Sequence, residues 1–156
     1  MEKIGLVTIT YNSADVIRDF LKSTFSQTFQ NFVIYIIDNN SQDDTLEILT
    51  EYTDSRIKLV KNKKNTGVAK ANNQGIELAL KDNCTQVLII NNDVEFEKQL
   101  FEKMLQVQKD KNCSLVVPKM MYFDNPDDIW YAGSTFIKKK GFLPIHKGIK
   151  QKDISQ

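Results

Sequence analysis

The sequence is poor in the residue types on which many common active sites depend. Its 156 residues include one histidine and two cysteines. A single histidine argues against a Ser-His-Asp triad and against a zinc site, and Cys84 and Cys113 form no closely spaced pair of metal ligands. We expect both cysteines to be buried thiols in a reducing cytosol.

Several nucleotide-binding and hydrolase motifs are also missing. No GxGxxG follows the first predicted strand, which argues against a dinucleotide site, and neither GxxxxGKS nor GxxxxGKT is present to form a P-loop. The GxSxG motif of hydrolases is absent too. The polar groups that remain at the ends of the predicted strands are carboxylates, amides, one tyrosine (Tyr11) and a few hydroxyls. Such groups can hold a base, a ribose and a metal-bound diphosphate.

Long hydrophobic runs and a strong charge imbalance are absent as well. No segment is long enough to span a membrane, and the N-terminus, MEKIGLVTIT, lacks the long apolar core of a signal peptide. The net charge of +1 does not indicate a nucleic-acid partner. The length suffices for one domain with a sizeable core. The last stretch, 138–156, differs from the rest because it carries a net charge of +5.

Apolar runs alternate with helical periodicity along most of the chain. Apolar runs predict strands over residues 4–9, 32–37, 57–60, 87–90 and 115–117. Apolar residues at helical spacing predict helices over residues 16–25, 43–52, 68–80 and 98–109. Three further short strands are expected over 121–123, 129–131 and 135–137. The alternation predicts an α/β fold with a mostly parallel central sheet and helices on both faces.

The stretch QVLIINNDVE, from Gln86 to Glu95, is the strongest indication of a site. Its apolar run is too short for a helix and rich in β-branched residues, so we expect a strand buried on both faces in the middle of the sheet. Ligands of open α/β sheets bind just outside the carboxyl ends of the strands, which would bring Asp93 to the binding edge. A carboxylate beside amides suits a hard divalent cation. The alternative is that Asn91 and Asp93 only turn the chain and cap the next helix.

Polar clusters end two other predicted strands, at Thr10–Ser13 and Asp38–Ser41. Right-handed crossovers bring the strand-to-helix loops of a parallel sheet to one edge. We therefore expect these two clusters to converge with Asn91–Asp93. Turn chemistry alone does not readily explain three polar clusters on one edge.

The sequence resembles the family-two glycosyltransferases of the GT-A fold in four stretches, which occur in the order found in that family. They are ITYNSADVIRDFLKSTFSQTF, VIYIIDNNSQDDT, NTGVAKANNQGIELAL and LIINNDVE. The resemblance covers roughly residues 4–135 and implies a Rossmann-like GT-A sandwich. It also implies sugar transfer from a nucleoside-diphosphate donor, usually with inversion and with Mg²⁺ or Mn²⁺. The NNDVE form and a later IWYAGS are most similar to the branch that includes rhamnosyltransferases of cell-surface polysaccharides.

The resemblance also implies the positions of the donor-binding residues. The first-strand motif, which packs against base and ribose, corresponds to Thr8, Thr10, Tyr11 and Asn12. The acidic pair that reads the base corresponds to Asp38 and Asn39, so an amide replaces the second carboxylate. The NxGxxxxxN stretch near the diphosphate and the sugar corresponds to Asn65, Gly67 and Asn73. For Tyr11 and Gly67 the alternatives are a half-buried aromatic at the sheet edge and a turn that requires positive φ.

The metal-binding DxD motif of the family corresponds to Asn91, Asn92 and Asp93. Asn91 replaces the first aspartate, so Asp93 remains as the metal carboxylate and Asn92 stands beside it in the donor site. Loss of one charge should weaken metal binding. We expect Glu95 to favour the start of the following helix rather than to bind the metal.

The catalytic base of the family, an Asp or Glu far downstream, has no counterpart among these residues. Asp153 is the only acid after Asp128, so the catalytic residue is unknown. We expect a donor-binding domain over 1–137, cut before the acceptor half, and a basic, partly disordered tail over 138–156. The acceptor of the full-length protein would be a glycan or a lipid-linked sugar.

Two other classes of protein and two interpretations of the tail remain open. The chain could be a non-catalytic nucleotide-sugar-binding or interaction module with the same fold, which the missing base favours. A nucleotidyltransferase is disfavoured because Thr10–Ser13 lacks the Gly-rich, basic first loop of those enzymes. The tail is either a solvated end or, through Lys138–Lys140, a peripheral contact with anionic lipid. We expect a cytoplasmic protein, in the second case at the inner face of the membrane.

Overall fold

The computed structural model describes residues 1–141 and 143–154, and these form two compact units. The first unit is Met1–Glu102 and the second is Lys103–Gln156. Each unit is described by itself below. The expected boundary between residues 137 and 138 stays a prediction. Three residues of the predicted tail, Phe142, Ser155 and Gln156, lie outside the described residues.

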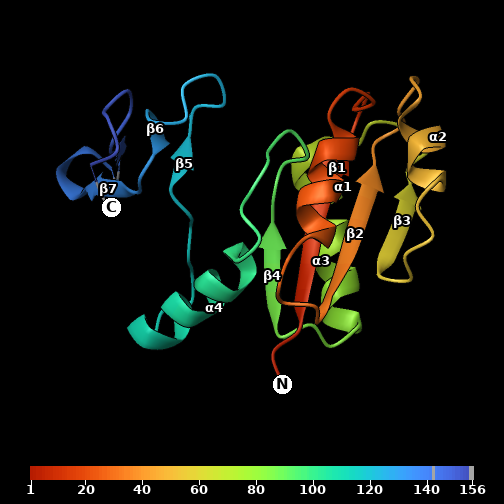
Figure 1. Ribbon diagram of the computed structural model, residues 1–156, viewed down its shortest axis with the longest axis horizontal. Coiled ribbons are helices and arrows are strands. Elements are labelled where there is room, and N and C mark those ends of the chain that lie inside the picture. The colour runs from red at the N-terminus through yellow and green to blue at the C-terminus, as the bar shows by residue number, and fades with distance from the viewer. Residues whose placement is uncertain (142, 155–156) are drawn as a thin grey trace. The chain divides into compact units, whose positions relative to one another are not determined.

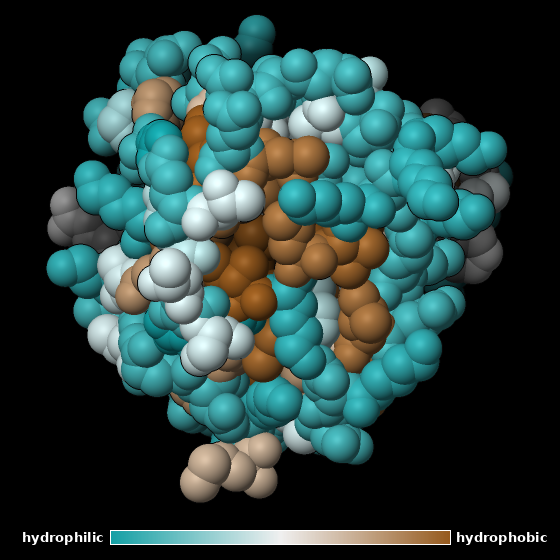
Figure 2. Space-filling model, turned by 90° about the vertical axis from the view of Figure 1, so that its right-hand side faces the viewer, coloured by the Kyte–Doolittle hydropathy of each residue, from teal (hydrophilic) through white to brown (hydrophobic). Residues whose placement is uncertain are grey.

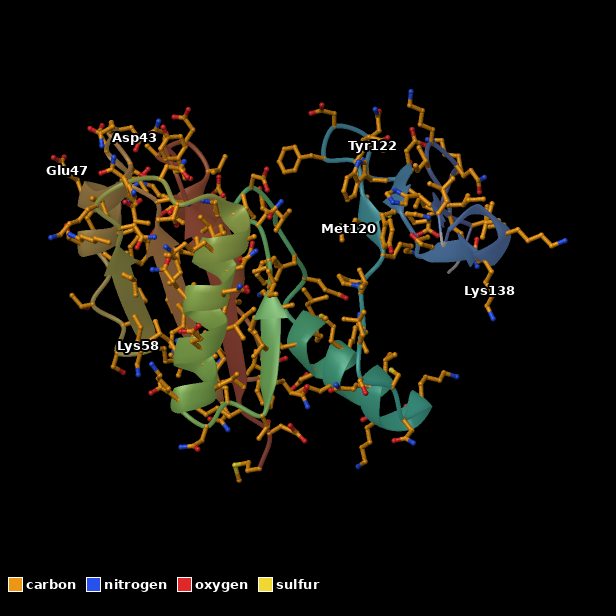
Figure 3. All side chains as sticks on the ribbon, turned by 180° about the vertical axis from the view of Figure 1, so that it is seen from behind. Asp43, Glu47, Lys58, Met120, Tyr122 and Lys138 are labelled. Atoms are coloured by element: carbon orange, nitrogen blue, oxygen red, sulfur yellow. The ribbon has the colours of Figure 1, made fainter. Side chains whose placement is uncertain are left out.

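The first unit alternates strands and helices as the sequence predicts (Figure 1). Its strands are β1 (Ile4–Thr10), β2 (Phe32–Asp38), β3 (Ile57–Lys61) and β4 (Gln86–Ile89). Its helices are α1 (Ile17–Phe25), α2 (Thr45–Thr50) and α3 (Val68–Lys81), and α4 (Leu100–Lys111) begins in it. α1 lies in front of the sheet in Figure 1 and α3 lies in front of it in Figure 3, so the two helices cover opposite faces.

All four strands of this sheet run parallel, in the order β3-β2-β1-β4. The expectation that the Gln86–Glu95 stretch supplies a central strand is wrong, because β4 lies at one edge of the described sheet and pairs with β1 alone. Its residue Ile89 is 52% exposed, whereas Leu6 and Val7 of β1 are fully buried. An apolar run in the sequence indicates an apolar strand, but it does not show whether both faces of that strand are buried. Burial depends on which strands and helices lie next to it. The carboxyl end of β4 nevertheless lies on the same side of the sheet as the carboxyl ends of β1 and β2, as predicted.

Small residues let α3 lie close against β1. The buried side of α3 carries Ala71, Gly75 and Ala79, spaced four residues apart. A Cβ atom added at Gly75 would lie 2.3 Å from a methyl carbon of Val7, and one added at Gly5 would lie 2.5 Å from the Cβ atom of Ala79. Because backbone and side chain interlock at this spacing, α3 can pack against the sheet in only one position. That position fixes where the first turn of α3 lies.

Aromatic rings form the core on the side of α1. Phe101 lies edge-on to Phe32, with ring centres 5.5 Å apart, and stacks on Phe96 at 6.0 Å. Phe96 in turn lies edge-on to Phe20 of α1 at 6.0 Å. Edge-to-face and offset pairs of this kind are favourable aromatic geometries. The cluster therefore ties the segment after β4 to α1 and β2.

The outer edge of the sheet is only partly covered. Three apolar side chains of β3, Ile57, Leu59 and Val60, are half-buried. Figure 2 shows apolar side chains gathered among hydrophilic ones on the side of the molecule that carries α2 and β3. The core of the first unit therefore lies mainly over β1 and β2.

The second unit contains two small antiparallel sheets. β5 (Met120–Met121) pairs with β6 (Ile129–Tyr131), and β7 (Ser134–Ile137) pairs with β8 (Leu143–His146). The 3₁₀ turn η1 (Lys138–Lys140) connects β7 to β8. The predicted strand over 129–131 is confirmed, and those over 121–123 and 135–137 are confirmed in outline with shifted bounds.

Two sequence-based expectations for the second unit are wrong. Residues 115–117 form no strand, because the chain there has no pairing partner among the described residues. Cys113 is half-exposed rather than buried, whereas Cys84 is buried, and both thiols are free.

No helix within the described residues is long and apolar enough to cross a membrane.

Candidate functional site

The loops after β1 and β2 are joined by hydrogen bonds at the carboxyl ends of the strands. The backbone N–H of Asn12 donates to the hydroxyl of Ser41 (3.0 Å), and the side-chain oxygen of Asn12 accepts from the backbone N–H of Gln42 (2.8 Å). The N–H of Ser13 donates to the Thr45 hydroxyl (2.7 Å). Asn12 has a φ of 52°, a left-handed conformation that asparagine tolerates. The predicted convergence of the first two polar clusters is confirmed.

Asp43 completes this junction at the start of α2. Its carboxylate accepts from the N–H of Ala14 (3.0 Å) and from both the N–H and the hydroxyl of Thr45. Desolvation opposes ionisation, but the hydrogen bonds from Thr45 and Ala14 outweigh it and lower the pKa of Asp43. Figure 3 shows Asp43 at the end of the sheet to which β1 and β2 run, and Lys58 near the opposite end.

Asp38 lies beneath the junction and is 1% exposed. One carboxylate oxygen accepts from the hydroxyls of Thr10 (2.9 Å) and Ser41 (2.5 Å). The other accepts from the backbone N–H groups of Asn40 (3.1 Å) and Ser41 (3.0 Å). Four donors thus surround this carboxylate. These bonds hold the loop after β2 in its conformation. The predicted contact between Asp38 and a base stays a prediction.

Asn39 links the end of β2 to the loop before α3. Its side-chain oxygen accepts from the amide of Asn62 (3.0 Å) and from the N–H and hydroxyl of Thr66. Its amide donates to the side-chain oxygen of Asn65 (3.2 Å) and approaches the carbonyl of Gly67 (3.5 Å). A carboxylate could not make the last two contacts as a donor. The amide that replaces the family's second acid is therefore the group that this loop requires.

A pocket of about 250 Å³ opens where β1, α3 and the segment after β4 meet. It is lined by Ile9, Tyr11, Ser13, Val68, Asn91, Asn92 and Asp93. Tyr11 is 50% exposed and Asp93 is exposed. The structure thus brings an aromatic ring, a carboxylate and amides to one pocket, as the sequence predicts. Ile9, Ser13 and Val68 were not predicted to line it.

Two buried polar atoms have no hydrogen-bond partner in the described structure, the hydroxyl oxygen of Thr8 and the side-chain nitrogen of Asn92. Asn92 lines the pocket, and its side-chain nitrogen is shielded from solvent there without a partner. Thr8 is fully buried within β1. Its expected contact with a ligand stays a prediction.

The remaining candidates, Asn65, Gly67 and Asn73, are not among the residues that line the pocket. Asn65 and Gly67 form the turn before α3, where Gly67 has φ 81° and ψ 159°, which only glycine readily adopts. The side-chain oxygen of Asn65 accepts from the N–H of Gly67 (2.9 Å). Asn73 lies on an exposed face of α3.

The oxygen groups around Asp93 fit a divalent cation that is held partly by the protein and partly by a substrate. Within the described residues, no three acidic, histidine or cysteine side chains come together as a metal site. Mg²⁺ is commonly held by one or two carboxylates plus waters and substrate phosphates, so a dedicated protein cage is not needed. Asp93, flanked by Asn91 and Asn92 at an open pocket, matches that pattern.

A parallel sheet with crossover helices and a polar pocket at the carboxyl ends of its strands is the arrangement in which open α/β domains bind ligands. The sequence profile of Glycosyl transferase family 2 matches residues 6–155, and the chain belongs to this family. It is 38% identical over 79 residues to WfaP of Escherichia coli, named a UDP-Glc:alpha-D-GlcNAc-diphosphoundecaprenol beta-1,3-glucosyltransferase. That match covers 51% of this chain and 32% of WfaP. The chain spans less than half the length of the curated relatives that it matches.

Solved structures share the fold. S. aureus TarS in complex with UDP-GlcNAc is similar at a TM-score of 0.62 and 22% identity, over 78% of this chain and 38% of TarS. The mannosyltransferase PcManGT from Pyrobaculum calidifontis, in complex with GDP-Man and Mn²⁺, is similar at a TM-score of 0.53 and 22% identity. That likeness covers 60% of this chain and 28% of PcManGT. The GT-A fold expected from the sequence motifs is confirmed.

Proposed function

We propose that this chain is the donor-binding part of an inverting glycosyltransferase that uses a nucleoside-diphosphate sugar and Mg²⁺ or Mn²⁺. The observation that carries the proposal is the pocket that joins Tyr11 to Asn91–Asp93. WfaP takes its sugar from UDP-Glc by name, TarS binds UDP-GlcNAc and PcManGT binds GDP-Man with Mn²⁺. These names support a nucleotide-sugar donor here.

Each pocket residue has a task in this proposal. Tyr11 presents a half-exposed ring that can stack on the base, and Asn92 donates a hydrogen bond to the donor. Asp93 and the amide oxygen of Asn91 would hold the cation, which when bound offsets the charge of the departing diphosphate. Thr10, Asp38 and Asn39 hold the loops around these groups. The acceptor hydroxyl needs a general base, which these residues do not supply because Asp93 is engaged with the cation.

The acceptor and the cellular site belong to the same proposal. WfaP has a lipid-linked acceptor by name, which supports a glycan or lipid-linked acceptor and a role in cell-surface polysaccharide synthesis. An enzyme with such an acceptor would work at the inner face of the membrane. Lys138, Lys139 and Lys147 are exposed in the second unit and could contact anionic lipid. Sedimentation with anionic but not with neutral vesicles is the expected result.

Replacement of Tyr11 by alanine is expected to weaken nucleoside-diphosphate binding by about 1–3 kcal/mol, the range found for aromatic rings that stack on bases. Tyr11→Phe, which keeps the ring, is the matched control and should bind as the parent does. Calorimetric titration with UDP, dTDP and GDP measures the effect. Equal affinity for the alanine variant and the parent would place the base elsewhere.

Replacement of Asp93 by asparagine is expected to remove the part of nucleotide affinity that depends on Mn²⁺. The change keeps the size of the side chain and deletes its charge, so the fold should be retained. The measurement is UDP affinity with and without Mn²⁺, and Glu95→Gln is the control for a nearby exposed carboxylate. A variant that still gains affinity from Mn²⁺ as the parent does would contradict the metal assignment.

The alternative is a nucleotide-sugar-binding module without catalysis, and the lack of an evident base favours it. Asp153, the only acid after Asp128, pairs with Lys119. A radiolabelled donor incubated with glycan and lipid-linked acceptors separates the two functions. We expect this chain to bind donor and at most to hydrolyse it slowly. Acceptor-dependent transfer at ordinary rates would mean that these residues contain the base.

A further inference from the structure

Gln27, in the connection between α1 and β2, is a buried polar side chain to which the donor-binding motifs assign no role. It is 1% exposed. A buried amide loses its bonds to water and is tolerated only where the protein replaces them. Its hydrogen-bond partners therefore indicate what the side chain does.

The amide of Gln27 holds the segment that follows the pocket. Its nitrogen donates to the carbonyl of Glu97 (2.7 Å) and to that of Ser23 within α1 (3.2 Å). Its oxygen accepts from the backbone N–H of Phe101 (3.1 Å). The N–H of the neighbouring Thr28 donates to the carbonyl of Lys98 (2.9 Å). Three anchor points, at Glu97, Lys98 and Phe101, thus fix the chain just before and within the first turn of α4.

The other end of the same segment is fixed by the sheet. The N–H of Ile90 donates to the carbonyl of Val7 in β1 (3.0 Å). Between Ile90 and Glu97 lies a short loop that carries the pocket residues Asn91–Asp93. Asp93 is exposed, so its position depends on how the two ends of the loop are held.

We propose that Gln27 is a positioning residue for the metal-binding carboxylate. It anchors the C-terminal end of the loop 91–96 and thereby directs Asp93 into the pocket, without touching donor or cation. The proposal rests on the proposed function, since it assigns Gln27 to the metal-dependent part of donor binding. It predicts that loss of the amide acts through Asp93.

The test is a double-mutant cycle. Gln27→Met keeps the length and apolar bulk of the side chain and removes its hydrogen bonds, and Asp93→Asn removes the carboxylate. UDP affinity is measured with and without Mn²⁺ for the parent, both single variants and the double variant. Gln106→Met, which removes an exposed amide that bonds to Asp110 within α4, is the control.

We expect Gln27→Met to reduce the affinity gain from Mn²⁺ by about fivefold or more, with metal-free affinity little changed. The Asp93→Asn background is expected to lack the Mn²⁺ gain, so Gln27→Met should leave its UDP affinity unchanged both with and without Mn²⁺. A purely structural role would lower the urea midpoint and leave the Mn²⁺ gain of the parent background intact. An unchanged gain, or an equal loss of UDP affinity in the Asp93→Asn background, overturns the proposal.

A second measurement keeps the proposal testable if the parent binds no nucleotide, which would refute the proposed function alone. Hydrogen exchange reports the anchor directly, because Phe101 N–H is bonded to Gln27. Gln27→Met should speed exchange at Phe101 and in residues 91–98 while β1 and β2 keep their protection. Unchanged exchange in that loop would overturn the anchor itself.

Discussion

Replacement of Gly75 by valine is expected to destabilise the first unit by about 3 kcal/mol, the upper part of the range for overpacked cores. The Cβ atom alone would lie 2.3 Å from one methyl carbon of Val7 and 3.1 Å from the other. Neither side can yield easily, because Val7 is fully buried on β1 and α3 is held along its length by Ala71 and Ala79. Urea unfolding followed by far-UV circular dichroism measures the loss.

Two further variants test the cause of that loss. Gly75→Ala would stabilise an exposed helix by up to about 1 kcal/mol, so destabilisation at this site would be due to the contact with Val7. Val7→Ala combined with Gly75→Ala should recover part of the lost stability, because the methyl groups that clash are gone. Equal stability of Gly75→Val and the parent would show that α3 can move away from the sheet, contrary to the packing described above.

The sequence predicts the order and type of elements in the first unit well, for a physical reason. Hydrophobic periodicity is a local property, and β1, β2, α1 and α3 each bury one clear apolar set. The place of a strand in a sheet is not local, which is why the apolar run of β4 suggests a centre while the strand lies at an edge. The run 115–117 fails similarly, because a β-branched segment forms a strand only beside a partner.

The predicted site shows a similar division between local and distant information. The sequence brings Tyr11, Asn92 and Asp93 to one edge because strand ends of a parallel sheet converge. It does not reveal that Asn39 turns inward or that Gln27 bonds to residues 70 or more positions away. A polar residue on an exposed loop and one that is fully bonded in the interior look alike in sequence. Motif resemblance therefore indicates a candidate site but does not distinguish contact residues from supporting ones.

Replacement of Asp38 by asparagine is expected to cost about 1–3 kcal/mol, the range for a buried hydrogen-bonding group left unsatisfied, because two of its four donors would then face an NH₂ group. If the nitrogen replaces the oxygen that the Asn40 and Ser41 N–H groups share, both donors lose their acceptor. In the other orientation the hydroxyls of Thr10 and Ser41 must turn their protons away and accept from the NH₂ group instead, and the negative charge that all four donors share is lost. Either way the loop that holds Asn12 through Ser41 loosens.

Nucleotide preference separates the two roles open to Asp38. Its 1% exposure and inward bonds predict that Asp38→Asn lowers affinity for UDP, dTDP and GDP by a similar factor, because the whole loop is disturbed. A residue that reads the base would instead change the preference among the three. Asp44→Asn is the matched control, since Asp44 lies in the same loop, is exposed and makes no side-chain cap bond. A stable Asp38→Asn variant with altered nucleotide preference would contradict the supporting role and favour direct contact between Asp38 and the base.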